Sequence, residues 1–141
     1  MATTNATISI SSDIMSYTTT INKTMVMKKL GTCTGLDETT GLSTKKFTAT
    51  TAVEIVGNAE GTAGKASKVY IRNTGSSRDN FFYVALNNSA AASDTTETIG
   101  KLYGGDWMLI PWIATAATTH DIVVAPNTAD EMTLEWMVFV E

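Results

Sequence analysis

The chain has very few of the side chains from which most metal and nucleophilic sites are built. Its 141 residues include a single cysteine, Cys33, and a single histidine, His120. One cysteine excludes a disulfide within the chain, and one cysteine with one histidine cannot form a structural zinc site. Because small secreted domains commonly depend on several disulfides, the lone cysteine also predicts synthesis in a reducing compartment.

Charged residues are scarce too, at 17% of the chain, and 14 acidic residues outnumber 10 basic ones. A protein that binds nucleic acid through its phosphates needs a clustered basic face. The pairs Lys28–Lys29 and Lys45–Lys46 are too short to provide one, and we expect them at solvated strand positions, where lysine also discourages edge pairing. The sequence therefore predicts no nucleic-acid partner.

Long hydrophobic runs are missing. No stretch approaches the roughly 18 consecutive apolar residues of a membrane-spanning helix. Residues 1–7 contain neither the basic region nor the apolar region of a secretory signal. These absences predict a protein that is made in the cytoplasm and has no membrane partner.

The residues that are abundant favour strands. Threonine occupies 25 positions, and runs of the helix-forming residues Leu, Glu, Lys and Arg are missing. Threonine, valine, isoleucine and the aromatic residues fit a pleated, half-buried surface. A chain of 141 residues is long enough to bury the core of one domain. We therefore expect a single all-β domain.

Alternating apolar positions predict about eight or nine short strands separated by turns, which is typical of a β-sandwich, a jelly roll or a barrel. The clearest strands cover residues 67–73, 80–87, 99–103, 107–112, 120–125 and 132–140. Residues 20–30 fit a strand or a short helical turn, and the β-rich surroundings favour the strand. Residues 45–56 predict one strand with a bulge near Thr50 and Thr51, where the alternation weakens.

The most apolar stretch of the chain follows a Gly-Gly-Asp turn. Gly104 and Gly105 can adopt positive φ at little cost, which predicts a hairpin turn before a core strand. Pro111 cannot donate a ladder hydrogen bond, so this strand should lie at a sheet edge, at a bulge or end there. Trp107 or Trp112 is expected to fill the core, and one face of the strand to meet a partner subunit.

The strand over residues 80–87 is apolar on both faces. Phe82 and Val84 point to one side, and Phe81 and Tyr83 point to the other. Because an isolated two-sheet sandwich has only one dry face per sheet, either a loop or another subunit should cover Phe81 and Tyr83.

The N-terminal residues 1–19 are predicted to form an extended arm, and residues 20–141 the sandwich domain. Ile8, Ile10 and Ile14 are sparse apolar positions at even spacing, which allows an extended strand but too little burial to fold alone. Two interpretations stay open at this point. Either a neighbouring subunit orders the arm, or the segment is an edge strand after a frayed terminus.

No catalytic motif emerges. The Gly57 loop resembles a phosphate-binding loop, but Ala59 and Ala66 replace its first glycine and its hydroxyl residue. His120 lacks a nucleophile motif such as Gly-x-Ser-x-Gly, and Cys33 has no basic neighbour to lower its pKa. The carboxylates lack calcium-loop spacing. The sequence therefore predicts no enzyme, no cofactor and no metal site.

From Lys68 onward, about half of the chain resembles small virion proteins of tailed phages. The shared motifs are a strand ending in Asn73-Thr-Gly and a Leu-x-x-Gly-Asp-x-x-x-Ile-Pro segment that starts at Leu102. A closing strand, Leu-Glu-Trp-Met-Val-Phe-Val from Leu134, completes them. These motifs are structural, and they carry no catalytic residue.

The resemblance implies a β-sandwich or jelly-roll subunit of the capsid decoration (cement) type, made in the host cytoplasm and located on the virion. Such a protein binds the major capsid protein on the outer capsid surface as a homo-oligomer, with a trimer favoured over a dimer. The arm, residues 3–17, would bind the shell. Candidate capsid or subunit contacts are Ile8, Ile10, Ile14, Tyr17, Phe81, Tyr83 and Trp112.

Two other functions remain as alternatives. A receptor- or glycan-binding module on a phage fibre or spike would expose Tyr103, Trp107 or Trp112 as a platform for sugars. A hydrolase would need His120, or two carboxylates brought together only by the fold.

Overall fold

The computed structural model of the chain describes residues 4–12, 19–27, 36, 38–60, 66–86, 97–113 and 120–141. The expected residues Ile14, Tyr17 and Cys33 lie outside these ranges. The described residues contain no α-helix, one 3-10 turn at Asn58–Glu60 and eleven strands. The strands are β1 (Thr4–Ser12), β2 (Thr19–Met27), β3 (Glu38–Thr39), β4 (Ser43–Phe47), β5 (Val53–Val56), β6 (Ala66–Asn73), β7 (Phe81–Leu86), β8 (Thr98–Tyr103), β9 (Trp107–Ile113), β10 (Ile122–Pro126) and β11 (Met132–Val140).

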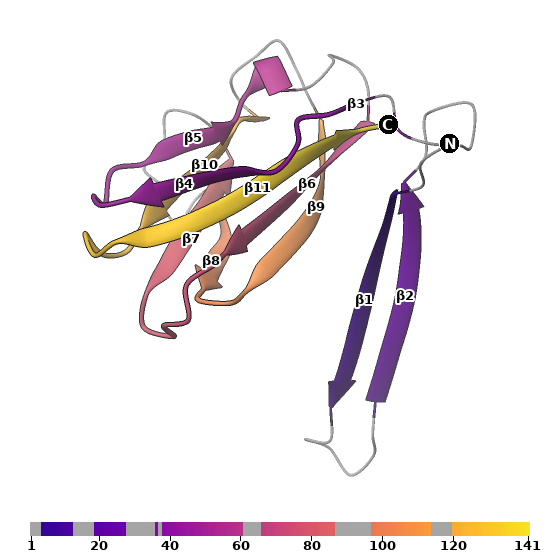
Figure 1. Cartoon of the computed structure of the whole chain (residues 1–141), viewed down its shortest axis with the longest axis horizontal. Coiled ribbons are helices and arrows are strands. Elements are labelled where there is room, and N and C mark those ends of the chain that lie inside the picture. Colours follow the sequence, from indigo (N-terminus) through magenta and orange to yellow (C-terminus); the bar gives the residue numbers. More distant parts are fainter. Residues whose placement is uncertain are drawn as a thin grey trace.

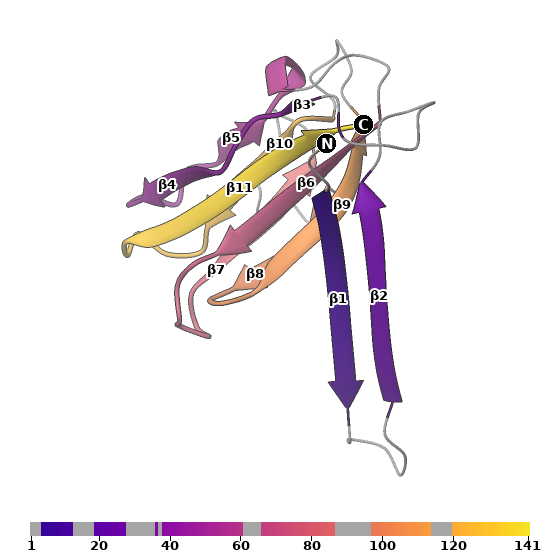
Figure 2. The ribbon, with the colours of Figure 1, turned by 45° about the vertical axis from the view of Figure 1, so that its right-hand side comes forward.

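The first two strands form a sheet of their own, which we call the ribbon. β1 and β2 are antiparallel and pair along all nine residues, with Ile10 opposite Ile21. The ribbon projects away from the rest of the chain (Figures 1 and 2). Residues 20–27 are therefore a strand, as expected, but they pair with the N-terminal segment and not with the sandwich to which the sequence had assigned them.

The other nine strands form a two-sheet sandwich, which confirms the expected all-β fold. One sheet, the β6 sheet, has the order β11–β6–β9, with β3 and β4 both pairing along the free edge of β11. The second sheet, the β7 sheet, has the order β5–β10–β7–β8. All strand pairs are antiparallel. β9 is the edge strand that Pro111 requires, and Pro111 lies opposite Lys68.

Two of the expected local structures are wrong for the same reason, namely that the chain changes sheets. Residues 45–56 are two strands, because β4 pairs with β11 in the β6 sheet whereas β5 pairs with β10 in the β7 sheet. The Gly-Gly-Asp turn is likewise not a hairpin. β8 pairs with β7, and β9 pairs with β6, so the turn joins the two sheets.

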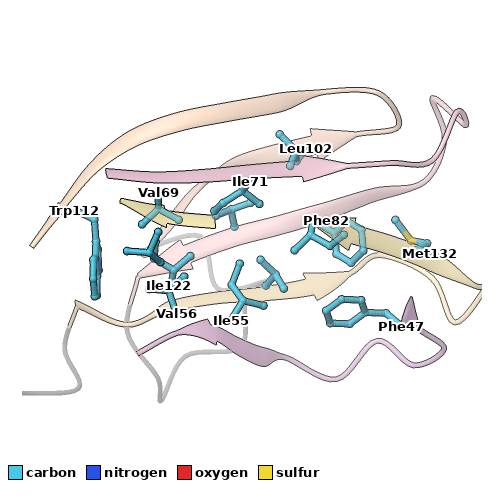
Figure 3. Packing of buried hydrophobic residues seen from close by; sticks show 14 of the residues in the cluster. Phe47, Ile55, Val56, Val69, Ile71, Phe82, Leu102, Trp112, Ile122 and Met132 are labelled. Atoms are coloured by element: carbon cyan, nitrogen blue, oxygen red, sulfur yellow. The ribbon is translucent and has the colours of Figure 1, made fainter. Parts of the chain in front are cut away.

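The core lies between the two sheets (Figure 3). Side chains from both sheets meet there, and Phe47 packs edge-on against Phe82 with ring centroids 5.1 Å apart. Trp112 is in this core, as expected for one of the two tryptophans of its strand. Trp107 points to the other face and is 47% exposed. The members buried most completely are Val56, Val69, Ile71, Phe82, Ile122, Val124, Leu134 and Val138.

A buried amide holds the two sheets together at one end. Asn73 is 1% exposed, and its Nδ2 donates to the Leu102 carbonyl of β8 at 3.0 Å. The Asn73 Oδ1 accepts from the Gly75 amide at 3.0 Å. Its main chain also exchanges hydrogen bonds with the turn after β8, donating to Asp106 and accepting from Gly105. Asn73 thus links the end of β6 to the opposite sheet.

The two glycines of that turn have different functions. Gly105 has φ of +85°, a conformation that costs a side-chain-bearing residue energy. Gly104 approaches the Ser77 backbone closely, and its amide donates to the Ser77 carbonyl at 3.0 Å. A Cβ on Gly104 would lie 2.3 Å from that same oxygen. Positive φ is therefore required at only one of the two positions.

We expect Asn73→Ala to lower the free energy of unfolding by about 2–3 kcal/mol, because it leaves the buried Leu102 carbonyl and the Gly75 amide without their partner. Urea denaturation measures this. Ser76→Ala, at an exposed position of the same loop, serves as control and should change stability by less than about 0.5 kcal/mol. Equal stability of the two variants would contradict the role given to Asn73.

Gly104→Ala should destabilise the fold by about 1–3 kcal/mol, because the new methyl group would lie within 2.3–2.9 Å of main-chain atoms of Ser76 and Ser77, which must shift to admit it. Gly100→Ala is the matched control, since a Cβ added at Gly100 would have no atom within 4 Å. It should be neutral or slightly stabilising. Thermal melts of both variants test the difference, and a Gly104→Ala protein that melts like the wild type would refute the close approach.

Candidate interaction surfaces

The ribbon is apolar on one face and polar on the other. Residues directly opposite each other in an antiparallel pair point to the same side. One side therefore collects the apolar residues Ala6, Ile8, Ile10, Ile21, Met25 and Met27, with Lys23 among them. The other side carries Asn5, Thr7, Ser9, Ser11, Thr20, Asn22 and Thr24, with Val26 as its one apolar member. Thr7 and Thr24 share a hydrogen bond of 2.9 Å across this polar face.

Most of the ribbon's apolar face is open to solvent. Met27, where the ribbon meets the sandwich, is only 2% exposed. Further along, Ile8 is 41%, Ile10 52%, Ile21 44% and Met25 39% exposed. A two-stranded hairpin is only marginally stable in water unless its hydrophobic face is covered. The ribbon thus presents an apolar surface that the described part of its own chain does not cover.

A cleft of about 500 Å³ separates the base of the ribbon from the outer face of the β6 sheet. Ala6 and Met27 line it from the ribbon, and Tyr70, Trp107 and Leu109 from the sheet. Its volume falls within the range of ligand pockets, roughly 300–1,000 Å³.

The polar groups on this outer face are already paired. Glu135 accepts a hydrogen bond from the Tyr70 hydroxyl at 2.8 Å and from the Arg72 guanidinium at 3.4 Å. Partial burial and the hydrogen bond to Glu135 raise the pKa of Tyr70 above its ordinary value. Lys68 forms an ion pair with Glu141. A tyrosine whose pKa is raised stays protonated at neutral pH, so its hydroxyl donates the hydrogen bond to Glu135.

The outer face of the β7 sheet carries an aromatic cluster capped by cations. Phe81 packs against Tyr83 and Tyr103, with ring centroids 5.0 Å apart in both pairs. The Lys101 Nζ lies 4.6 Å from the Phe81 centroid and 5.6 Å from that of Tyr83. Arg78 lies over Tyr103 at 5.6 Å. The second apolar face of β7 is therefore partly covered by side chains of its own chain.

The residues expected to contact a partner differ in how far they are exposed in the structure. Ile8 and Ile10 lie on the open face of the ribbon, and Phe81 and Tyr83 are half-buried in the aromatic cluster. The expectation that Trp112 contacts a partner does not fit the structure. Trp112 is 7% exposed, and its Nε1 donates a hydrogen bond to the His120 carbonyl at 2.7 Å. A side chain so buried is not available to a partner.

The sequence did not identify Ile21 and Met25 as surface residues, and Trp107 was named only as one of three alternatives for a sugar-binding platform. The period-2 spacing of Ile21 and Met25 does signal a strand with one apolar face. The partner of that strand is β1, however, and spacing carries no information on partners. Trp107 lies in a strand that is apolar on both faces, so alternation gave no signal for it.

Three carboxylates gather near the start of the β5–β6 connection. Glu54 is largely exposed, yet partial burial, together with the negative charges of Asp121 and Glu60, raises its pKa above the usual 4.5. Glu60 accepts a hydrogen bond from the Gly57 amide at 2.8 Å.

Within the described ranges, no three His, Cys, Asp or Glu side chains are grouped so that they could hold a metal ion. Within the same ranges, no helix is long and apolar enough to span a membrane.

The chain matches no family model, and comparisons with curated proteins and with solved structures likewise find no match. The ribbon, the cleft and the aromatic cluster are therefore the basis for any functional proposal.

Glu54→Gln should stabilise the protein at pH 7 and have less effect at pH 4. Since the folded-state pKa of Glu54 lies above its ordinary value, proton binding stabilises the fold at low pH, and that contribution is lost as the pH rises through the folded pKa. The glutamine side chain of the variant does not ionise, so it does not lose this stabilisation as the pH rises. We expect a gain of a few tenths of a kcal/mol at pH 7, because the group is solvent-screened.

Melting temperatures of the wild type and the variant at pH 4 and pH 7 test this. Glu131→Gln is the control, since Glu131 pairs with Lys46 in an exposed salt bridge and should gain nothing at pH 7. A Glu54→Gln difference that is larger at pH 4 than at pH 7 would contradict the direction of the shift.

Proposed function

We propose that the protein is a structural subunit of a phage particle. It acts as a capsid decoration protein that binds the major capsid protein as a homo-oligomer and stabilises the contacts between capsomers without catalysing a reaction. The observation that carries the proposal is the ribbon, which projects from the sandwich with Ile8, Ile10, Ile21 and Met25 uncovered. An uncovered apolar face of this kind is typical of a protein that works inside an assembly.

The strand order supports the proposal. We infer that the sandwich is a jelly roll, since its sheets contain β4–β11–β6–β9 and β5–β10–β7–β8, and the chain alternates between them at almost every connection. Jelly rolls of eight strands are common in viral capsid and lectin domains. This step is an analogy at the level of the fold, and the residues of the ribbon carry the rest.

Capsids that lack the protein provide the test. Purified protein added to them should co-sediment at a fixed ratio to the major capsid protein, and it should raise the temperature at which the shell opens, because each bound oligomer bridges neighbouring capsomers. Gel densitometry and a dye that reports released DNA measure the two effects. Binding at no defined ratio, or binding without a shift in shell opening, would refute the decoration role.

A second candidate function, glycan binding, is favoured by Trp107. Its indole is half-exposed at the cleft, beside the polar groups of Tyr70 and Arg72. An aromatic ring with polar neighbours suits stacking against a sugar ring. If this function is correct, a glycan array should give hits that Trp107→Ala abolishes. Ile113→Ala, equally exposed on the same face of β9, should leave those hits unchanged. The absence of hits for the wild type would dismiss this candidate.

A further inference from the structure

We infer that the ribbon of one copy packs its apolar face against the outer face of the β6 sheet, along β9, of a second copy of the chain. This contact forms in the free protein. It rests on the homo-oligomer of the proposed function and specifies the two surfaces that would form it, whereas capsid binding is tested separately.

The ribbon needs a covering surface that its own sandwich does not supply. At its base, Met27 is 2% exposed and lines the cleft together with Tyr70 and Leu109 of the sheet. Ile10 and Ile21, directly opposite each other, lie further from the sandwich and are about half exposed. The opposite face, with Ser9 opposite Asn22, is polar and suited to water. The ribbon is therefore suited to pack its apolar face against another protein surface while its polar face stays in water.

The outer face of β9 is a suitable receiving surface. β9 is the edge strand of its sheet. Trp107, Leu109 and Ile113 alternate with core residues and point outward, and Trp107 and Ile113 are 47% and 51% exposed. These side chains and those of the ribbon are both apolar, so each leaves water when they meet. Every copy of the chain thus carries one donor surface and one receiving surface.

Charge selects this pairing over contact between two ribbons. Residues 1–30 contain three lysines and one aspartate, whereas residues 31–141 contain seven basic and thirteen acidic residues. Lys23 lies on the apolar face of the ribbon itself, between Ile21 and Met25 along β2. Two ribbons face to face would bring the Lys23 side chains of both copies onto the contact, whereas residues 31–141, which form the sandwich, carry a net negative charge.

The size of the contact favours reciprocal exchange. A ribbon of nine residue pairs is about 30 Å long and about 10 Å wide, so one apolar face covers roughly 300 Å². A specific interface commonly buries about 800 Å² per partner. If each copy both gives a ribbon and receives one, the footprint per copy doubles to about 600 Å², roughly three quarters of that value. We therefore infer a closed oligomer, in which no ribbon is left uncovered.

The first experiment uses two matched double variants of the full-length chain. Ile10→Asp with Ile21→Asp places two charges on the apolar face, and Ser9→Asp with Asn22→Asp places two charges on the polar face one residue away. Light scattering after size exclusion should give an oligomer for the wild type and for the polar-face variant. The apolar-face variant should fall to the monomer mass of 15.1 kDa, with a dissociation constant raised at least about 100-fold.

Circular dichroism and thermal melts show whether each variant keeps its sandwich, so that a loss of oligomer is not mistaken for unfolding. A monomeric wild type at about 100 μM would overturn the inference, because two complementary apolar surfaces of this size should associate at that concentration. An apolar-face variant that keeps the wild-type mass, or a polar-face variant that loses it equally, would overturn it too.

The second experiment identifies the receiving surface. Two full-length chains of different tag length, one with Ile10→Cys and the other with Leu109→Cys, are mixed in a Cys33→Ser background and treated with a short bis-maleimide. A cross-linked product that contains one copy of each chain supports contact between the ribbon and β9. Ser9→Cys in place of Ile10→Cys should give little product. No mixed product, or equal product from Ser9→Cys, would exclude docking on β9.

Discussion

The buried side-chain amide of Asn73 joins the two sheets at one end of the sandwich. It ends β6, reaches across to the Leu102 carbonyl of β8 and fixes the loop that leads into β7. Its main chain also fixes the turn from β8 to β9, in which Gly104 lies against Ser77. Because that turn sets where β9 begins, the outer face with Trp107 and Leu109 depends on the same contact. A polar group inside the fold thus positions an apolar surface outside it.

Alternation along the sequence predicted most strands of the sandwich, since β6, β7, β8, β10 and β11 each contribute an inward face to the core. It could not predict which strands pair. Residues 45–56 keep apolar residues at odd positions, yet Phe47 and Ile55 reach the core from opposite sheets. Period 2 reports which way a side chain points relative to its own strand, and it contains no information on the sheet to which that strand belongs.

The candidate surfaces were predicted only in part, for related reasons. Ile8 and Ile10 stood out because the residues around them are polar. Ile21 and Met25 also lie an even number of residues apart, but they were assigned to the sandwich because their pairing with β1 is a contact between residues distant in the sequence. Trp107 and Trp112 belong to a strand that is apolar on both faces, so burial of one and exposure of the other follows from the position of β9 at the edge of its sheet.

The central strands of both sheets are the last two strands of the sandwich to be synthesised. β10 lies between β5 and β7, and β11 lies between β6 and the pair β3 and β4. While the ribosome is still making residues 122–140, each sheet lacks an interior strand. Of the pairs seen in the sandwich, β6 with β9 and β7 with β8 are then the ones that can form. The two sheets can therefore close only after residue 140 has been made, and slowly, as is usual for chains dominated by long-range pairing. A copy truncated before β10 would lack a strand from the interior of each sheet, so β3, β4 and β5 would have no partner strand.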